Sequence, residues 1–294
     1  MDVKNRKTGG LVESVVRKSM VIRPSGRSTD FIAPSFGQGC LFECSYCYCK
    51  RHKPEGLTVS KNVIDILTEI NHHAWFAEVE KPNQTHDEYI TYDIGCNEDL
   101  ALHHKYYPFD KIVEFFKRSD KAYGSFATKY VNPDLLKHSP GRKMRIRFSL
   151  MPQKYADLLE PETSPIIDRI KAIDQFVAKG WDVHINYSPV IVTDGWEKEY
   201  EELFKLVDEH VNYKRVVKAE VIFLTHNENK HEYNLQKLLP GEELLWRPEI
   251  QEEKVSQYGG KNIRYKHELK DGYITIFKML HHNIIPWNTI RYIF

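Results

Sequence analysis

Over the first 225 residues, short runs of β-branched and aromatic residues alternate with segments in which apolar residues recur every three or four positions. The runs are typical of buried strands, and the periodic segments are typical of helices that cover a sheet. Such alternation favours parallel strand–helix–strand units over a sandwich or a helix bundle. The predicted strands are 30–34, 88–94, 124–129, 144–150, 182–192 and 218–224, and the predicted helices are 60–77, 109–117, 164–179 and 195–211.

The segment 164–179 shows the helical period most clearly. Its isoleucines, Ile166 and Ile173 among them, recur near a period of 3.6 residues, so this face is expected to pack on a sheet. Pro165 is predicted at the first helical position, with Gly180 past the end. Six strand–helix units predict an α/β fold, a partial (β/α)6 barrel that is TIM-like but open on one side. On such barrels the chemistry lies at the C-terminal ends of the strands.

The alternation stops near residue 225, which divides the chain into three predicted parts. These are a basic N-terminal arm over 1–29, the barrel over 30–225 and a C-terminal extension over 226–294. Residues 1–27 carry seven basic and two acidic side chains. This charge fits either a solvated tail or an arm that contacts phosphate groups.

Composition narrows the class of protein. With 294 residues and 41% hydrophobic content, the chain can bury a large core without a disulfide or a metal to stabilise it. The net charge of +1 indicates neither a nucleic-acid nor a membrane partner for the molecule as a whole. No apolar run reaches the roughly 18 residues that span a bilayer, and the N-terminus lacks the apolar core of a signal peptide. We therefore expect a cytoplasmic protein.

Four of the five cysteines lie within ten residues, a spacing that suits a metal site better than disulfides. Cys40, Cys44 and Cys47 follow the first predicted strand with the C-x3-C-x2-C spacing of the radical S-adenosylmethionine (SAM) superfamily. There, three thiolates bind three irons of a [4Fe-4S] cluster and the fourth iron binds SAM. The alternative is a zinc site completed by Cys49 or His52. It is disfavoured because zinc sites usually draw ligands from two separated knuckles, and no second C-x2-C is present.

Further motifs resemble the spore photoproduct lyase family, radical SAM enzymes that revert a thymine dimer in spore DNA. The resemblance runs from about residue 31 to residue 205, with weaker similarity to about residue 265. It is carried by Cys44-Ser-Tyr46-Cys47-Tyr48, Tyr92-Asp93-Ile94, Ala127-Thr128-Lys129-Tyr130, Arg145-Ile-Arg147-Phe148-Ser149, Glu160-Pro-Glu-Thr163-Ser164-Pro165 and Pro189…Asp194-Gly195-Trp196-Glu197.

The resemblance implies roles for several residues. Lys129 would contact the SAM carboxylate and Ser149 would lie by its ribose, while Tyr46 and Tyr48 would line the reaction pocket. The alternatives are a surface salt bridge for Lys129 and ordinary barrel packing for the tyrosines. Asp93 ends the second predicted strand, where a carboxylate is more often functional, and we group it with the cofactor-binding residues. The resemblance also implies an electron donor such as flavodoxin or ferredoxin.

The chain departs from the family at one catalytic position. In the lyase, a cysteine three residues before the motif's aspartate returns a hydrogen atom to the product radical, and here that position is Ile90. Cys96 is predicted to replace it if its loop folds back over the pocket, and a buried structural thiol is the alternative. An isomerase can take its hydrogen back from 5′-deoxyadenosine. The missing cysteine therefore slightly favours isomerisation or modification of a thymine-derived base in DNA over dimer repair.

A non-catalytic iron–sulfur protein that binds nucleic acid is a third alternative.

The C-terminal extension loosely resembles the family's hairpin against lesion DNA, and Lys261, Arg264 and Lys266 follow two glycines there. These three residues are predicted to contact DNA phosphates, although a bare basic loop has the same composition. Three adjacent histidine pairs, at 72–73, 103–104 and 281–282, are predicted to lie at the surface, because neighbours point apart on helices and strands.

Overall fold

The computed structural model describes residues 12–49, 53, 55–77, 80–255 and 261–294. Its contacts divide the chain into two compact units. The first unit comprises Met1–Leu41, Tyr48–Thr128 and Asn132–Ile146. The second unit comprises Phe42–Cys47, Lys129–Val131 and Arg147–Phe294.

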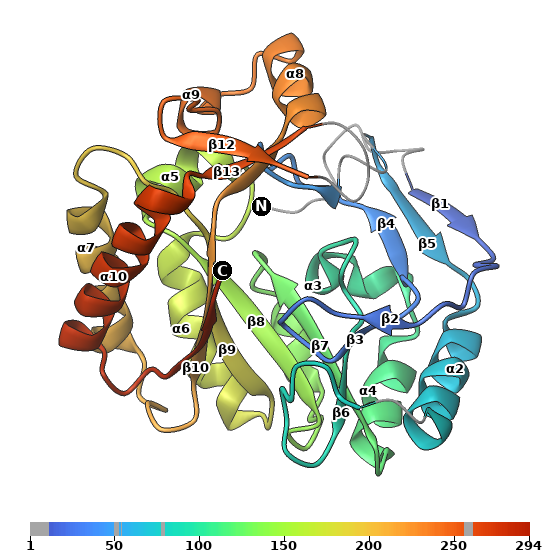
Figure 1. The fold of residues 1–294 in the computed structure, drawn as a ribbon. Coiled ribbons are helices and arrows are strands. Elements are labelled where there is room, and N and C mark those ends of the chain that lie inside the picture. Colours follow the sequence, from blue (N-terminus) through green and yellow to red (C-terminus); the bar gives the residue numbers. More distant parts are fainter. Residues whose placement is uncertain (1–11, 50–52, 54, 78–79, 256–260) are drawn as a thin grey trace. The chain divides into compact units, whose positions relative to one another are not determined.

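The first unit contains two sheets and three α-helices among its described residues (Figure 1). In the larger sheet the parallel strands β3, β6 and β7 lie side by side, and β2 adds to β3 in antiparallel fashion. In the smaller sheet β5 lies between β1 and β4. The elements are β1 (Val12–Val15), β2 (Arg23–Pro24), β3 (Phe31–Ile32), β4 (Gly37–Gly39), β5 (Leu57–Ser60), α2 (Val63–Phe76), β6 (Ile90–Asp93), α3 (Leu100–His103), α4 (Phe109–Arg118) and β7 (Ala122–Thr128).

The second unit is built on parallel strands, with β9 and β14 on either side of β10. Strand β8 (Met144–Leu150) begins in the first unit and ends in the second, where it neighbours β9. A small antiparallel sheet has the order β11-β13-β12. The other elements are α5 (Gln153–Leu159), α6 (Ile166–Ala178), β9 (Asp182–Val190), α7 (Trp196–His210), β10 (Lys218–Phe223), β11 (Thr225–Asn227), α8 (Glu228–Gln236), α9 (Glu242–Leu245), β12 (Gln251–Lys254), β13 (Asn262–Tyr265), α10 (His267–Ile284) and β14 (Ile290–Ile293).

Strand β8 is buried on both faces, and the two faces differ in character. Successive side chains of a strand point to opposite sides. Met144, Ile146, Phe148 and Leu150 therefore share an apolar face, on which Phe148 packs edge-on against Phe176 of α6. Arg145, Arg147 and Ser149 share the other face, and all three are buried. The strand thus separates a hydrocarbon core from a polar face.

Helices α7 and α10 pack together over the second unit's strands (Figure 1). Phe277 of α10 is the centre of this contact and is fully buried. Its ring centroid lies 5.2 Å from that of Phe204, 5.7 Å from that of Tyr187 and 6.1 Å from that of Phe223. Burial of four such aromatic rings fixes the helices on the sheet by a large apolar area.

All six predicted strands and all four predicted helices are present, with boundaries shifted by a few residues. Pro165, predicted at the first helical position, is instead the N-cap residue of α6, one position before the helix begins. Several further elements were not predicted, among them helix α10 and strand β14. Strand β14 pairs in parallel with β10, so a C-terminal segment belongs to the sheet of the second unit. No helix among the described residues is long and apolar enough to cross a bilayer.

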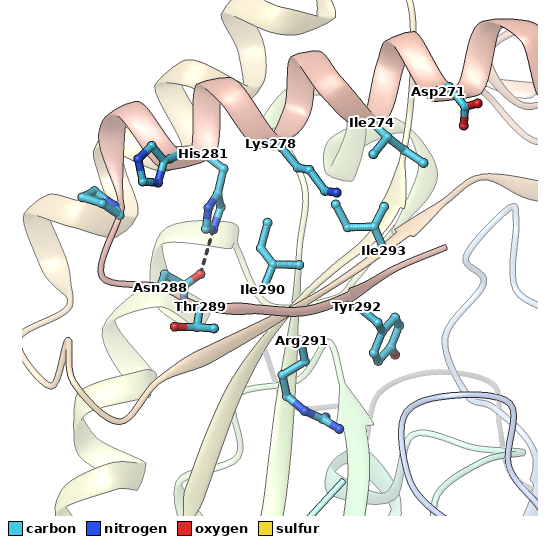
Figure 2. A pocket seen from close by; sticks show the side chains of 12 residues that line it. Asp271, Ile274, Lys278, His281, Asn288, Thr289, Ile290, Arg291, Tyr292 and Ile293 are labelled. Atoms are coloured by element: carbon cyan, nitrogen blue, oxygen red, sulfur yellow. Dashed lines mark hydrogen bonds between the residues drawn. The ribbon is translucent and has the colours of Figure 1, made fainter. Parts of the chain in front are cut away.

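The surface prediction for the histidine pairs is wrong for two members. His103 is fully buried, with its Nδ1 2.9 Å from a carboxylate oxygen of Glu98. His281 is buried as well, and its Nε2 lies 3.1 Å from the side-chain oxygen of Asn288 (Figure 2). Their neighbours point away, as the predicted geometry requires, but the inward member of each pair meets a polar partner in the core.

A hollow of about 720 Å³ opens between α10 and β14 in the second unit (Figure 2). Side chains of Ile274 and Lys278 on the helix and of Ile290 and Ile293 on the strand line it. Its lining includes none of the residues predicted to bind the cluster, SAM or DNA. The residues predicted to carry chemistry therefore lie elsewhere, at and around the cysteines.

Candidate active site

Cys44 and Cys47 share one turn of the second unit. The Cys47 N–H donates to the Cys44 carbonyl oxygen at 3.1 Å. Cys44 is buried, and Cys47 is partly exposed. Cys40 is also buried and follows β4 in the first unit. Gly39, just before it, has a φ of +94°, and a side chain there would meet the carbonyl oxygen of Gly56 at 2.5 Å. Only glycine fits this approach to Cys40.

Lys129 and Tyr46 lie beside this turn. The Lys129 ammonium is 5.4 Å from the centroid of the Tyr46 ring, within cation–π distance. Burial lowers the pKa of Lys129, but the negative charges of the Glu160 carboxylate and of the Cys44 and Cys47 thiolates outweigh it, so the pKa lies above its ordinary value. The structure therefore keeps a positive charge next to two cysteines, as the binding of an anionic group requires.

Glu160 and Arg169 hold this group in place and were not predicted as site residues. The Tyr46 hydroxyl donates to one carboxylate oxygen of Glu160, and the Arg169 guanidinium lies 2.7 Å from the other. Burial and the Glu160 carboxylate raise the pKa of Tyr46 well above its ordinary value. The phenol therefore keeps its proton at neutral pH and can act as a donor.

Arg169 also connects Ser149 to the site. Its guanidinium donates to the carbonyl oxygens of Ser149 and Ser164, each at 2.8 Å. The Ser149 hydroxyl accepts from the side-chain amide of Asn186 at 3.4 Å, on the polar face of the strands. The sequence contained one indication of this role. Arg169 is a charged residue in the apolar stripe of the predicted helix 164–179, and such a residue is buried only if polar partners contact it.

Tyr48, Asp93 and Cys96 belong to the first unit. Asp93 ends β6, and its carboxylate accepts the Gly95 N–H at 3.0 Å, which tightens the turn that leads to Cys96. The Tyr48 hydroxyl donates to the Cys96 carbonyl oxygen and lies 3.7 Å from the Cys96 sulfur. The loop after β6 therefore brings Cys96 to Tyr48, one of the predicted pocket tyrosines.

His103 contacts the start of the cysteine segment in the first unit. The Leu41 N–H donates to its Nε2 at 3.4 Å, so this nitrogen accepts and Nδ1 carries the proton toward Glu98. The Tyr107 hydroxyl donates to the same carboxylate at 2.8 Å. This buried series of hydrogen bonds ends at Leu41, the residue after Cys40. In the sequence, His103 stood out only as one of two adjacent histidines.

The three basic residues predicted to contact DNA each have a partner on or beside the β12–β13 hairpin. Lys261 pairs with Glu253 at 2.8 Å, and Arg264 pairs with Glu252 at 2.9 Å. The Lys266 ammonium donates to the Glu249 carbonyl oxygen at 3.0 Å. To contact phosphate groups, these basic side chains would first have to give up their present protein partners. The two glycines at 259–260 lie outside the described residues.

In the described part of the chain, no group of three or more His, Cys, Asp or Glu side chains is arranged to hold a metal ion. Neither the cluster nor zinc therefore has a preformed cage there. His52, the alternative zinc ligand, lies outside the described residues, whereas Cys49 is buried in the first unit. The donor chemistry fits an iron–sulfur cluster. Two thiols share a turn beside a lysine, and a third thiol precedes them by four residues.

Two examples of the solved structures that resemble this fold are variants of spore photoproduct lyase. One is a cysteine-to-alanine variant of spore photoproduct lyase with dinucleoside spore photoproduct, with a TM-score of 0.85 and 21% identity, covering 96% of this chain and 82% of that chain. The other is a double variant of the lyase with bound AdoMet and dinucleoside spore photoproduct, with a TM-score of 0.85, 20% identity and the same coverage. The likeness confirms the predicted fold class, a mixed α/β partial barrel of the radical SAM type.

Two curated relatives match in sequence. Spore photoproduct lyase of Bacillus subtilis is 28% identical over 198 residues, which are 66% of this chain and 55% of that protein. Spore photoproduct lyase of Clostridium acetobutylicum is 26% identical over 263 residues, which are 87% of this chain and 74% of that protein. The match thus spans about half the length of the first relative. The family model described as spore photoproduct lyase matches residues 4–294, and the chain belongs to the spore photoproduct lyase family.

Proposed function

We propose that this chain is a radical SAM enzyme that reverts a thymine dimer of the spore-photoproduct type in DNA. The observation that carries the proposal is the group of the half-buried Lys129 and Tyr46 with the buried Glu160 at the turn of Cys44 and Cys47. The names of the matched relatives support dimer repair better than the isomerisation that the sequence slightly favoured. Residue roles at the site belong to the proposal as well.

Cys40, Cys44 and Cys47 would hold the [4Fe-4S] cluster. When bound, the cluster and SAM supply a 5′-deoxyadenosyl radical that abstracts a hydrogen atom from the substrate. Lys129 offers a fixed positive charge for the carboxylate of SAM, and Ser149 offers a hydroxyl for its ribose. Asp93 is grouped with them as a carboxylate at a strand end. A flavodoxin- or ferredoxin-type protein would supply the electron.

Tyr48 and Cys96 carry the proposed hydrogen return. The thiol can donate a hydrogen atom to a substrate radical, which a repair reaction needs at its end. The thiyl radical that this leaves on Cys96 would be reduced back to the thiol by one electron from the flavodoxin- or ferredoxin-type protein and one proton. The Tyr48 hydroxyl holds the Cys96 backbone and lies near its sulfur, so the two residues form one local group. Cys96 would thus supply the thiol that Ile90 lacks.

A second candidate remains the isomerisation or modification of a thymine-derived base. The observation that favours it is Ile90 itself, a half-buried apolar residue at the start of β6 in the place of the family's cysteine. An isomerase returns the hydrogen from 5′-deoxyadenosine and needs no protein thiol.

The experiment uses the anaerobically reconstituted, reduced chain with SAM and dinucleoside spore photoproduct. We expect 5′-deoxyadenosine and the dithymidine product by liquid chromatography and mass spectrometry, and neither from a Cys44→Ala variant. A new nucleoside in digested thymine-modified DNA, without dithymidine, would instead support isomerisation. Failure to form 5′-deoxyadenosine at all would refute both reactions.

A further inference from the structure

The segment from β11 to α9 in the second unit contains a buried polar cluster that the proposed chemistry does not use. Its centre is the carboxylate of Glu242, the first residue of α9. One carboxylate oxygen lies 2.9 Å from Nε2 of His226 and 2.6 Å from Nδ1 of His231. The other oxygen accepts from the side-chain amide of Asn234. His231 in turn stacks on Trp246, with centroids 4.3 Å apart and rings 11° from parallel.

These contacts keep Glu242 ionised although it is buried. Burial raises the pKa of Glu242, but the hydrogen bonds of His226, Asn234 and His231 and the charge of His226 outweigh it, so the pKa lies below its ordinary value. A carboxylate with both oxygens engaged is a strong acceptor with a fixed direction. It therefore fixes the orientation of the Asn234 amide.

Asn234 connects this cluster to the cysteine turn. Its side-chain nitrogen donates to the backbone carbonyl oxygen of Ser45 at 2.8 Å and also to Glu242. Both neighbours can only accept, so the opposite amide orientation would place oxygen against two acceptors. Asn234 is fully buried, so these two acceptors decide the orientation of its amide. The Asn234 amide nitrogen is therefore fixed as a donor to the carbonyl oxygen of Ser45, which lies between Cys44 and Tyr46 in the sequence.

Ser45 has two further contacts in the same unit. Its N–H donates to the Leu159 carbonyl oxygen at 2.9 Å, and its hydroxyl donates to that of Pro240 at 3.4 Å. Gly241 allows the close packing, because it has a φ of +81° and a side chain there would meet Leu159 at 2.6 Å. Helix α5, helix α8 and the segment just before α9 thus each contact Ser45 in the turn.

We propose that Asn234 and Glu242 are positioning residues for the iron–sulfur site. They fix the Ser45 peptide and thereby the spacing of the thiolates of Cys44 and Cys47. The inference rests on the proposed function, because it assumes that these thiolates hold the cluster. It assigns the α8–α9 segment a role in cluster retention. A side chain that only stabilises the fold would change the melting temperature without changing how fast iron is lost.

The test compares Asn234→Leu with a matched control, Asn288→Leu. Both asparagines are buried in the second unit, and each donates to a backbone carbonyl oxygen. Asn288 lies by His281 at the hollow between α10 and β14 (Figure 2), and within the described part of the chain its hydrogen bonds go to His281, Val217 and Ile285 and not to the cysteine turn. The readouts on the full, reconstituted chain are iron per chain, the electron paramagnetic resonance spectrum of the reduced cluster, and the rate of iron release to a chelator.

Loss of an outer partner of a metal site typically costs about 10–100-fold in metal affinity. We therefore expect iron release from Asn234→Leu to be about tenfold faster than from the parent, with an altered spectrum. Asn288→Leu should lower the melting temperature but keep the parent's release rate. If Asn234→Leu does not fold, Glu242→Gln provides the test. Glutamine keeps the shape of the glutamate side chain and removes its charge, so iron release should again be faster than from the parent.

An Asn234→Leu or Glu242→Gln variant that retains iron as long as the parent, with an unchanged spectrum, would overturn the inference and leave the proposed function intact. Equal acceleration in Asn288→Leu would overturn it too, because loss of iron would then follow general stability. A parent chain that assembles no cluster would refute the proposed function itself, and the inference with it.

Discussion

At the scale of single residues, Lys129 shows how a cation is maintained beside the cysteine turn. The negative charge of the neighbouring Glu160 carboxylate is the largest of the contributions that offset its burial, and the pKa of Lys129 stays above its ordinary value. The same surroundings give it a fixed place over the Tyr46 ring. A charge held in this way is available to an incoming carboxylate without prior rearrangement.

Replacement of Lys129 by Met should therefore weaken SAM binding. A hydrogen bond to a charged group contributes about 1.5–3 kcal/mol, so the dissociation constant should rise by about 10–100-fold. Equilibrium binding of SAM to the reconstituted chain measures this change. Lys205→Met is the control, because Lys205 pairs with Glu201 and Glu202 on the exposed face of α7. Equal affinity in Lys129→Met and the parent would exclude Lys129 from the SAM site.

Cys96 allows a test at the level of one sulfur atom. Cys96→Ala should leave the formation of 5′-deoxyadenosine intact and divert the repaired product, because the substrate radical loses its hydrogen donor. Product analysis by mass spectrometry distinguishes the two steps. Cys49→Ala removes another thiol near the cluster segment and should repair normally. Normal repair by Cys96→Ala would reduce Cys96 to a packing residue.

At the scale of elements, the polar face of the second unit's strands carries a charge network around Glu220 on β10. Arg291 on β14 lies 2.6 Å from its carboxylate, His184 on β9 lies 3.3 Å from it, and Arg147 on β8 lies 3.5 Å from it. Burial raises the pKa of Glu220, but these partners outweigh it and bring the pKa to about 2. The network thus joins four strands through one carboxylate.

This network makes stability depend on pH. Since the pKa of Glu220 falls on folding, the unfolded chain binds its proton more readily, and stability declines as pH drops below the ordinary value of 4.5 toward 2. Between pH 5 and pH 3 this should cost about 2 kcal/mol in the free energy of unfolding. Denaturant titrations should show this loss in the parent and not in Glu220→Gln, which cannot titrate. Parallel pH profiles for the two proteins would contradict it.

The elements that the sequence predicted well are those whose pattern is local. Strands such as β8 and β9 and helices such as α6 carry their period in their own residues, and their burial follows from it. Helix α10 was missed because only Phe277 and His281 along its length are buried, and a histidine does not count as apolar in a periodicity. Strand β14 is short and half-exposed, so its place in the sheet depends on its neighbour β10.

The candidate site was likewise predictable only where its residues belong to local motifs. Cys44, Cys47, Tyr46 and Lys129 were found from spacing and family motifs, and the structure gathers them in one unit. Their supports, including Arg169, reach them from far along the chain. Which partner meets a buried polar group is decided by tertiary packing, and no local pattern records it.

At the scale of the whole molecule, the balance of 42 basic and 41 acidic residues gives no general attraction to DNA. Binding of the proposed DNA substrate would then depend on local positive charge, and phosphate contacts release counterions. Affinity for a thymine-rich oligonucleotide should fall linearly with salt on logarithmic axes. The slope should drop by about 0.7–0.9 for each phosphate contact removed.

Fluorescence anisotropy across a salt series measures this slope. The triple variant Lys261→Gln, Arg264→Gln and Lys266→Gln should flatten it, whereas Lys205→Gln on α7 should not. An unchanged slope in the triple variant would place the DNA elsewhere on the protein. Binding independent of salt would instead indicate a small-molecule substrate.

The alternation within β8 has a consequence for how this family can vary in length. A substitution in the strand changes one face, but the insertion or deletion of a single residue exchanges the two faces for everything that follows. Arg147 would then point into the apolar core, while Phe148 would take its place on the polar face. A scan of one-residue insertions and deletions should therefore find this strand intolerant, even at positions that accept several replacements.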